Sequence, residues 1–179
     1  CVQVPSLWGK VSRGLRILQF EDGVTREHAT YQGETIKQAD VNLLAYPLGK
    51  ITDVRQQQKD LAYYAERIDQ RDGPMMSYAV FCVQYARMGN AAKAYEMFCR
   101  CYQPNWRPPF GVLSETPSSN NPYFMTGAGG LLQAVLNGFC GLQVTEKGII
   151  QLPSVLPLHW KKVTVTGVGV EKKVYVREQ

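Results

Sequence analysis

The chain has 179 residues, enough for one domain with a substantial core, and its 45% hydrophobic content is ordinary for a globular protein. No apolar run approaches the ~20 residues that a membrane-spanning helix needs, so a membrane span is excluded. The net charge of +5 comes from scattered basic residues rather than from blocks, which argues against a nucleic-acid partner.

The chain begins at Cys1 without an initiator methionine and ends in a strand-like run, so we expect both ends to be cuts through a larger protein. The cysteines are odd in number, and four of them fall within helical patterns: Cys82, Cys99, Cys101 and Cys140. This placement favours buried free thiols over a disulfide framework. Free thiols favour the cytoplasm, but an export signal would lie upstream, so the compartment stays open.

His28 and His159 are the only histidines, and they are far apart in the sequence. No metal-ligand spacing results from this pair, so we expect neither a metal nor another cofactor.

The first half of the chain predicts a series of helices after a short helical opening and a strand-like run at residues 15–20. A helix over residues 35–46 ends before Pro47, and Asp40 on its apolar face is expected to hydrogen-bond, for example to Lys37. Thr52 is a plausible cap for the next helix, which carries the apolar stripe Val54, Leu61, Ala65 and Ile68.

Residues 72–74 (Asp-Gly-Pro) begin a third helix, and Gly89 ends it. Asn90 begins a fourth, for which Ala91, Tyr95, Phe98 and Tyr102 form the expected buried side. The short joint between these two helices makes them antiparallel neighbours.

Residues 103–126 have no helical period and include several prolines and aromatic residues, which indicates an ordered working loop. A last helix is expected over residues 129–139. After Gly141 the pattern changes to short strands at residues 142–144, 148–152, 162–165 and 174–176, an incomplete antiparallel β module.

Three features could carry chemistry. Glu115 is a loop carboxylate that could deprotonate a water, or it could be a solvated glutamate or a local cap. Lys37 and Gln38 offer donors and an amide oxygen that suit vicinal sugar hydroxyls, or they are simply surface side chains. Gly127, Gly129 and Gly130 could let the backbone approach a ligand, or they allow close helix packing.

Several ordered motifs carry a resemblance to a known family. They are residues 31–34 (Tyr-Gln-Gly-Glu), 36–41 (Ile-Lys-Gln-Ala-Asp-Val), 46–48 (Tyr-Pro-Leu), 73–74 (Gly-Pro), 77–79 (Ser-Tyr-Ala), 114–116 (Ser-Glu-Thr), 123–130 (Tyr-Phe-Met-Thr-Gly-Ala-Gly-Gly) and 132–135 (Leu-Gln-Ala-Val). In this order they resemble glycoside hydrolase family 65, which comprises trehalose, maltose and kojibiose phosphorylases, acid trehalases and related α-glucosidases. The likeness covers about residues 5–145 and fades in the β tail.

The resemblance implies a mainly α fold, the second half of an (α/α)₆ barrel over residues 1–141, followed by an incomplete C-terminal β-sheet module over residues 142–179. It implies that Lys37 and Gln38 bind the glucose unit being cleaved off, and that Glu115 is the general base. It also implies inversion of configuration, with a water between two carboxyls ~6.5–9.5 Å apart.

The family's general acid lies further upstream than this chain reaches, and none of Glu21, Glu27 and Glu34 sits in the family's acid motif. We therefore expect the chain to be a piece of a longer hydrolase, to be inactive alone, and to need the missing N-terminal half of the same protein as its partner.

Hydrolysis of a trehalose-, kojibiose- or nigerose-like glucoside is favoured over phosphorolysis. The family's phosphorylases lack the base and use a histidine near the glycine-rich segment, and Phe124-Met125 stands there in this chain. A phosphorylase that releases glucose 1-phosphate, or a non-catalytic carbohydrate-binding module, remains the alternative.

Overall fold

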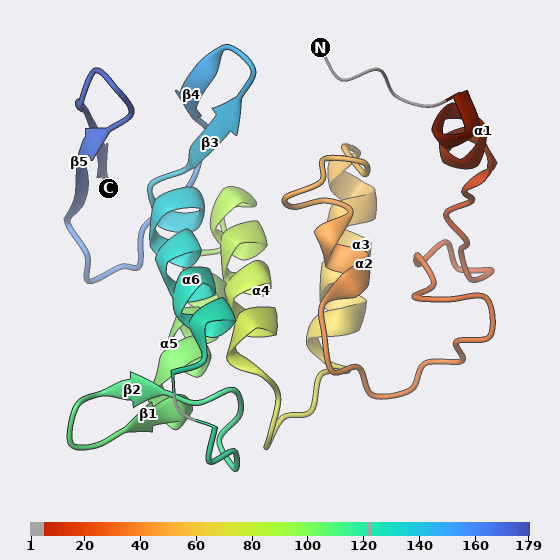
Figure 1. The fold of residues 1–179 in the computed structure, drawn as a ribbon, viewed down its shortest axis with the longest axis horizontal. Helices are drawn as coiled ribbons and strands as arrows, with labels where there is room; N and C mark the ends of the chain where they lie inside the picture. The colour runs from red at the N-terminus through yellow and green to blue at the C-terminus, as the bar shows by residue number, and fades with distance from the viewer. Residues whose placement is uncertain (1–5, 122) are drawn as a thin grey trace.

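The computed structural model describes residues 6–121 and 123–179, and this part of the chain is mainly helical with three two-stranded antiparallel hairpins (Figure 1). The helices are α1 (Ser6–Gly14), α2 (Asp40–Leu43), α3 (Val54–Ala65), α4 (Met75–Arg87), α5 (Ala91–Tyr102) and α6 (Met125–Gln133), with a 3₁₀ turn η1 (Gln103–Asn105) and a π-helical continuation of α6, η2 (Ala134–Phe139). The hairpins pair β1 (Trp106–Arg107) with β2 (Val112–Leu113), β3 (Leu142–Thr145) with β4 (Gly148–Gln151), and β5 (Lys162–Val168) with β6 (Lys173–Glu178). None of the described helices combines the length and apolar character that crossing a bilayer requires.

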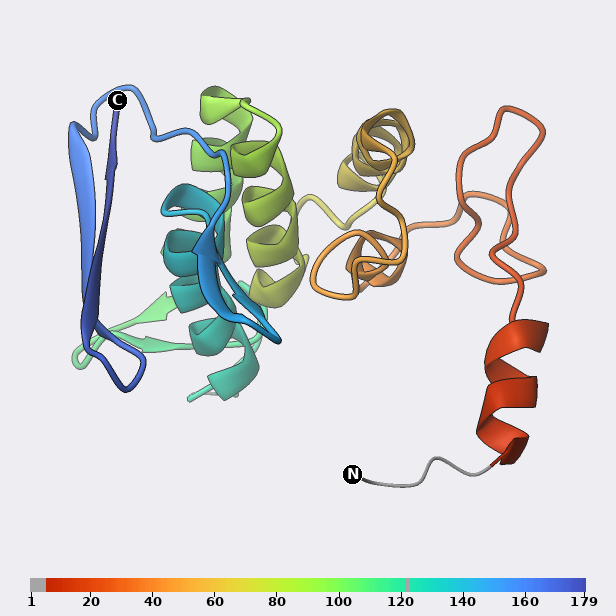
Figure 2. The ribbon, with the colours of Figure 1, turned by 90° about the horizontal axis from the view of Figure 1, so that it is seen from above.

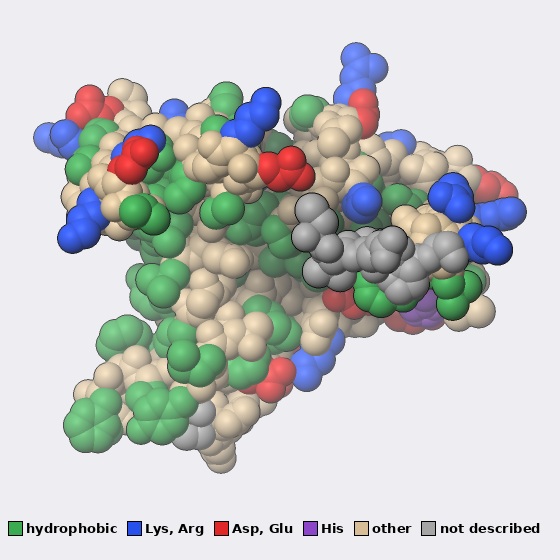
Figure 3. Space-filling model, turned by 45° about the horizontal axis from the view of Figure 1, so that its top comes forward, with side chains coloured by type: hydrophobic (Ala, Val, Ile, Leu, Met, Phe, Trp, Pro, Cys, Tyr) green, Lys and Arg blue, Asp and Glu red, His purple; other side chains and the backbone are tan. Residues whose placement is uncertain are grey.

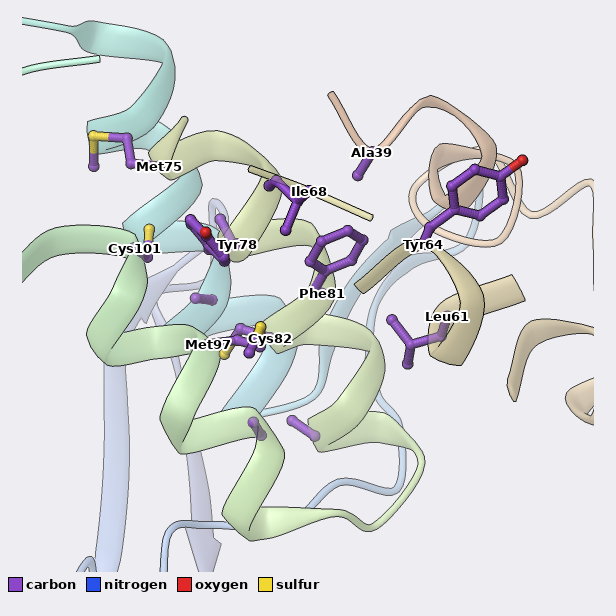
Figure 4. Packing of buried hydrophobic residues seen from close by; sticks show 14 of the residues in the cluster. Ala39, Leu61, Tyr64, Ile68, Met75, Tyr78, Phe81, Cys82, Met97 and Cys101 are labelled. Carbon is purple, nitrogen blue, oxygen red and sulfur yellow. The ribbon is translucent and has the colours of Figure 1, made fainter. Parts of the chain in front are cut away.

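Helix α4 is the centre of the core. It lies beside α5 and α6 in both ribbon views, and most of its side chains are buried (Figures 1 and 2). Figure 4 shows Cys82 of α4 next to Met97 of α5, and both belong to one apolar cluster. The described cysteines are free thiols, as predicted, although Cys99 is only half-buried. Cys1 lies outside the described residues.

The sequence predicted α4 and α5 well, including the cap at Asn90, whose side chain accepts a hydrogen bond from the Lys93 amide at 3.0 Å. The predicted buried side of α5 is shifted by one residue. The fully buried side chains are Ala94, Met97 and Cys101, and the predicted set is half-buried. The reason is that α5 has two partners, α4 on one side and the aromatic residues Phe139 and Trp160 on the other.

The predicted helix over residues 35–46 is wrong, because α2 contains only Asp40–Leu43. Ile36 forms a parallel bridge with Ile68, and its amide donates to the Arg67 carbonyl at 2.9 Å. This pairing keeps the backbone extended up to Ile36, so Lys37 and Gln38 lie in a bend before the helix.

Two further boundaries differ from the prediction. Asp53, not Thr52, caps α3, since its carboxylate accepts from the Gln56 amide at 2.7 Å. Helix α6 begins at Met125, so the glycines at 127, 129 and 130 lie within its first turns rather than before it.

The N-terminal region extends to one end of the molecule (Figure 2). The strand-like run at residues 15–20 forms only an isolated bridge between Gln19 and Thr25. On α1 three apolar side chains, Leu7, Trp8 and Val11, are exposed, so this helix has an uncovered apolar face.

The C-terminal hairpins confirm the predicted antiparallel strands. The segment between them packs onto the helices: the Val155 amide donates to the Ala86 carbonyl at 3.1 Å, and Leu156 is buried in the helical core.

Candidate active site

The structure brings Lys37 and Glu115 into direct contact. The ammonium Nζ of Lys37 lies 3.0 Å from the carboxylate Oε1 of Glu115, and the side chains are 64% and 25% exposed. The expected bond between Lys37 and Asp40 is not the one that forms; the Lys37 ammonium pairs with Glu115, and Asp40 is exposed. A carboxylate at this position can accept a proton from a water, and the ammonium beside it offers hydrogen-bond donors.

Backbone contacts fix the position of Glu115. Ser114 is fully buried, and its hydroxyl donates to the Thr116 carbonyl at 2.8 Å while its amide donates to the Asn105 carbonyl at 3.0 Å. The carbonyl of Glu115 itself accepts from the amide of Met75, the first residue of α4, at 3.1 Å. The carboxylate is therefore presented from a short braced turn beside the start of α4.

The segment after Glu115 is held from two sides. The Arg107 guanidinium donates to the carbonyls of Thr116 and Pro117. Asp72 accepts from the Ser118 amide at 2.8 Å and from the Ser118 hydroxyl at 2.7 Å, and these hydrogen bonds hold the pKa of Asp72 below its usual value. Asp72 therefore stays ionised, and this brace persists at neutral pH.

Two hollows meet at the bend that carries Lys37 and Gln38. The first, here called the acidic hollow, has a volume of about 470 Å³ and is lined by Thr35, Ile36, Lys37, Asp69, Asp72, Pro74, Glu115, Thr116, Ser118 and Ser119. The second, the glycine hollow, has a volume of about 320 Å³ and is lined by Gln38, Ala39, Asp40, Leu43, Met76, Ser77, Ala79, Val80, Met125, Thr126, Gly129, Gly130 and Gln133. Lys37 and Gln38 thus line adjacent hollows rather than one, and residues from the first turns of α2, α4 and α6 line the glycine hollow.

Two of the three glycines serve helix packing. A Cβ on Gly127 would overlap the side chain of Met75, and one on Gly130 would lie 2.9 Å from the Cβ of Ala79, so both allow α6 to approach α4 closely. Gly129 differs, because a Cβ there would meet no atom within 4 Å. Gly129 leaves room in the glycine hollow.

A larger hollow of about 550 Å³ lies by Arg87, at the opposite end of α4 from Met75, and contains none of the candidate residues. The guanidinium there donates to the carbonyls of Asn137 and Leu142 and to the side chain of Gln143, and burial lowers its pKa. These contacts use three of its five N–H donors and tie α4 to η2 and to the start of β3.

Comparison with known proteins gives several similar relatives. A kojibiose hydrolase of Mucilaginibacter mallensis is 54% identical over 169 residues, covering 94% of this chain and 25% of that protein. A kojibiose hydrolase of Flavobacterium johnsoniae is 50% identical, covering 98% of this chain and 26% of the relative. An acid trehalase of Emericella nidulans is 34% identical, and the match covers 84% of this chain and 15% of that protein.

The chain belongs to glycoside hydrolase family 65. It spans about a quarter of the length of these kojibiose hydrolases. No family model matches the chain.

Sequence reasoning on this family 65 chain missed the residues that hold the site together. Ser77 donates from its hydroxyl to the carbonyl of Lys37 at 3.0 Å, and Asp72 and Arg107 brace the turn after Glu115. Ser77 and Lys37 are 40 residues apart, and Asp72 and Ser118 are 46 apart, so no local spacing rule would have found these two pairs. The nearest signal was the Gly73-Pro74 and Ser77 motif, which was noted without a role.

Proposed function

We propose that this chain is part of an inverting α-glucoside hydrolase that cleaves a glucose-containing disaccharide or a glucosyl conjugate, with kojibiose, trehalose and nigerose as model substrates. Glu115 acts as the general base, and Lys37 and Gln38 hold the glucose unit. The supporting observation is the 3.0 Å contact between the Lys37 ammonium and the Glu115 carboxylate, from two segments far apart in the sequence.

The chemistry follows from these groups. The anionic Glu115 takes a proton from a water as that water attacks the anomeric carbon, and the product has the opposite configuration. An ammonium has three donors, so Lys37 can keep its contact with Glu115 and still bind sugar hydroxyls. Gln38 can donate and accept from the neighbouring glycine hollow.

The general acid would come from the part of the protein that precedes this chain. The two carboxyls would stand ~6.5–9.5 Å apart to leave room for the water. One carboxylate cannot both activate water and protonate the leaving oxygen, so the chain alone would be inactive.

The proposed architecture is the second half of an (α/α)₆ barrel over residues 1–141 and a C-terminal β module over residues 142–179. The starts of α2, α4 and α6 at one hollow support it, as does the change from helix to strand at Leu142. The exposed apolar side chains of α1 suit cover by the N-terminal half of the same protein.

Three observations favour hydrolysis over phosphorolysis. Glu115 lines the acidic hollow, where its charge would repel phosphate but activate water. Both histidines lie elsewhere: His28 packs against Tyr31 and His159 against Tyr95, and neither lines either hollow. The relatives reported above are named as hydrolases and a trehalase.

The test is Glu115→Gln in the full-length protein, with release of β-glucose from kojibiose, trehalose and nigerose measured with and without phosphate. Removing a general base lowers kcat by about 10²–10⁴-fold. Glu66→Gln, which alters an exposed carboxylate outside both hollows, is the matched control and should leave kcat unchanged.

Three results would overturn the proposal. Near-normal turnover by Glu115→Gln removes Glu115 from the mechanism. A requirement for phosphate with release of glucose 1-phosphate identifies a phosphorylase. Saccharide binding in calorimetry without turnover by the full-length protein identifies a binding module.

A further inference from the structure

We propose that Ser77 is a positioning residue that holds the sugar-binding bend at Lys37 and Gln38 in register with Glu115. This inference rests on the proposed function. The side chain of Ser77 is 1% exposed, and its hydroxyl donates to the Lys37 carbonyl at 3.0 Å. Ser77 also lines the glycine hollow, but its hydroxyl is bonded to the backbone of Lys37, so we expect it to act by holding that backbone in place.

The first turn of α4 holds both candidate segments. The amide of Met75 donates to the Glu115 carbonyl at 3.1 Å, and two residues later the hydroxyl of Ser77 donates to the Lys37 carbonyl at 3.0 Å. One rigid helical turn therefore sets the separation between the base and the lysine. The Met75 side chain also packs against Gly127 of α6, so the same turn contacts the helix that lines the glycine hollow.

The bend needs such an anchor because its own helix is weak. Helix α2 has four residues, and Ala39 at its N-cap makes no side-chain capping bond. Just upstream, Ile36 is anchored by the hydrogen bond from its backbone amide to the Arg67 carbonyl. Ser77 supplies an anchor at the next residue, and loss of its hydroxyl would leave the Lys37 carbonyl without this donor.

The chain offers a matched control. Ser154 donates from its hydroxyl to the Gly138 carbonyl at 2.6 Å, and it lines neither hollow. Ser77→Ala and Ser154→Ala each remove one hydroxyl-to-carbonyl bond, but only the first touches the bend. Comparing the two separates an effect on the site from a general loss of stability.

The first measurement is amide hydrogen exchange in the full-length protein. We expect faster exchange at residues 37–40 in Ser77→Ala, at least threefold relative to wild type, and no change there in Ser154→Ala. This readout does not depend on catalysis. Unchanged exchange at residues 37–40 would overturn the anchoring role even if the full-length protein proved to have no glycosidase activity.

The second measurement is a double-mutant cycle on kcat/KM. Ser77→Ala should lower kcat/KM by roughly five- to tenfold, with KM raised, because the lysine and amide are no longer held in place. In a Lys37→Met background the same change should cost clearly less than it does in the wild type, since only the effect through Gln38 remains. If Ser77 had a merely structural role, the fold-loss in kcat/KM of the double variant would equal the product of the fold-losses of the two single variants, and that result would overturn the proposal. A kcat/KM for Ser77→Ala within twofold of wild type would also overturn it.

A variant with the same side-chain size keeps the test available if Ser77→Ala fails to fold. Ser77→Cys places a weaker donor at the same position. Ser77→Cys should show a smaller rise in amide hydrogen exchange at residues 37–40 and a smaller fall in kcat/KM. If both quantities stayed at their wild-type values, the result would count against the anchor.

Discussion

The ammonium of Lys37 lies 3.0 Å from the carboxylate of Glu115, and neither residue is in a helix. Lys37 lies in a bend before α2, and Glu115 lies in a braced turn after β2. Both bend and turn are hydrogen-bonded to the first turn of α4. The core helix thus positions both segments, and the candidate catalytic and binding residues lie in loops.

Lys37→Met in the full-length protein should impair the site. Loss of the ammonium removes sugar-binding donors and leaves Glu115 without its cationic neighbour, so KM should rise about tenfold or more while kcat also falls. Lys93→Met is the control, because Lys93 pairs with Glu96 on the exposed side of α5. Steady-state kinetics that show equal effects of both variants would contradict the prediction.

Gly127→Ala and Gly129→Ala form a matched pair on α6. A methyl group at 127 would overlap Met75, so overpacking should lower the free energy of unfolding by about 1–3 kcal/mol. A methyl group at 129 meets open space in a helix, where alanine is favoured by up to about 1 kcal/mol. Urea unfolding of the two full-length variants decides the matter, and equal stabilities would refute the close packing of α6 on α4.

Asp60 should contribute more to stability than Asp53. Asp60 is buried and accepts from the amide and the hydroxyl of Thr25, each at 2.8 Å, and from the Gln56 side chain at 2.9 Å. Asp60→Ala leaves these donors unsatisfied and should cost about 2–4 kcal/mol, whereas Asp53→Ala removes an exposed helix cap worth about 1 kcal/mol. Asp60→Ala should therefore unfold at a lower urea midpoint than Asp53→Ala. The reverse order would rule out the buried network.

Alkaline pH should destabilise the fold through buried acids. Burial raises the pKa of Cys101 to about 12 and, with help from Tyr63, that of Tyr31 to about 12. In the unfolded chain these groups have pKa values of about 8.5 and about 10. The folded state therefore keeps protons that the unfolded state loses, and each group costs about 1.4 kcal/mol per pH unit between its two pKa values. Unfolding free energies that stay level from pH 8 to pH 11 would contradict this.

Thiol reactivity offers an independent check on burial. Cys82 and Cys101 are fully buried, and burial raises both pKa values, so little thiolate forms at pH 8. Iodoacetamide should alkylate the half-buried Cys99 before either of them in the native protein, as peptide mass spectrometry would reveal. Rapid alkylation of Cys101 without unfolding would contradict the core arrangement.

The helices that the sequence predicted best are those with a cap or a long apolar stripe. Helix α5 has both, as the Asn90 cap illustrates, and α4 has a long buried apolar stripe although Pro74 at its start makes no side-chain capping bond. The prediction failed at residues 35–39, where helical spacing of Ile36 and Ala39 was read as a helix. The bridge to Ile68 takes Ile36 into an extended conformation instead, and a tertiary pairing of this kind leaves no mark in local periodicity.

The site residues were found from their chemical types and from the family motifs, not from their geometry. In the structure Lys37 and Glu115 line one hollow, while Gln38 lines the adjacent one. Ser77 and Arg107 could not be predicted, because their roles depend on hydrogen bonds to backbone carbonyls, which no side-chain pattern in the sequence reveals. Their roles in catalysis, like those of Lys37, Gln38 and Glu115, stay predictions for the experiments above.

Apolar side chains gather over hairpin β1–β2, and Trp106 and Phe110 there are exposed (Figure 3). The turn that carries Glu115 follows this hairpin, and its brace is built from polar contacts by Arg107 and Asp72 rather than from core packing. Insertions or exchanges in the hairpin tip would therefore leave α4 and its neighbours undisturbed. The exposed tip of this hairpin is thus the part of the region most tolerant of sequence change.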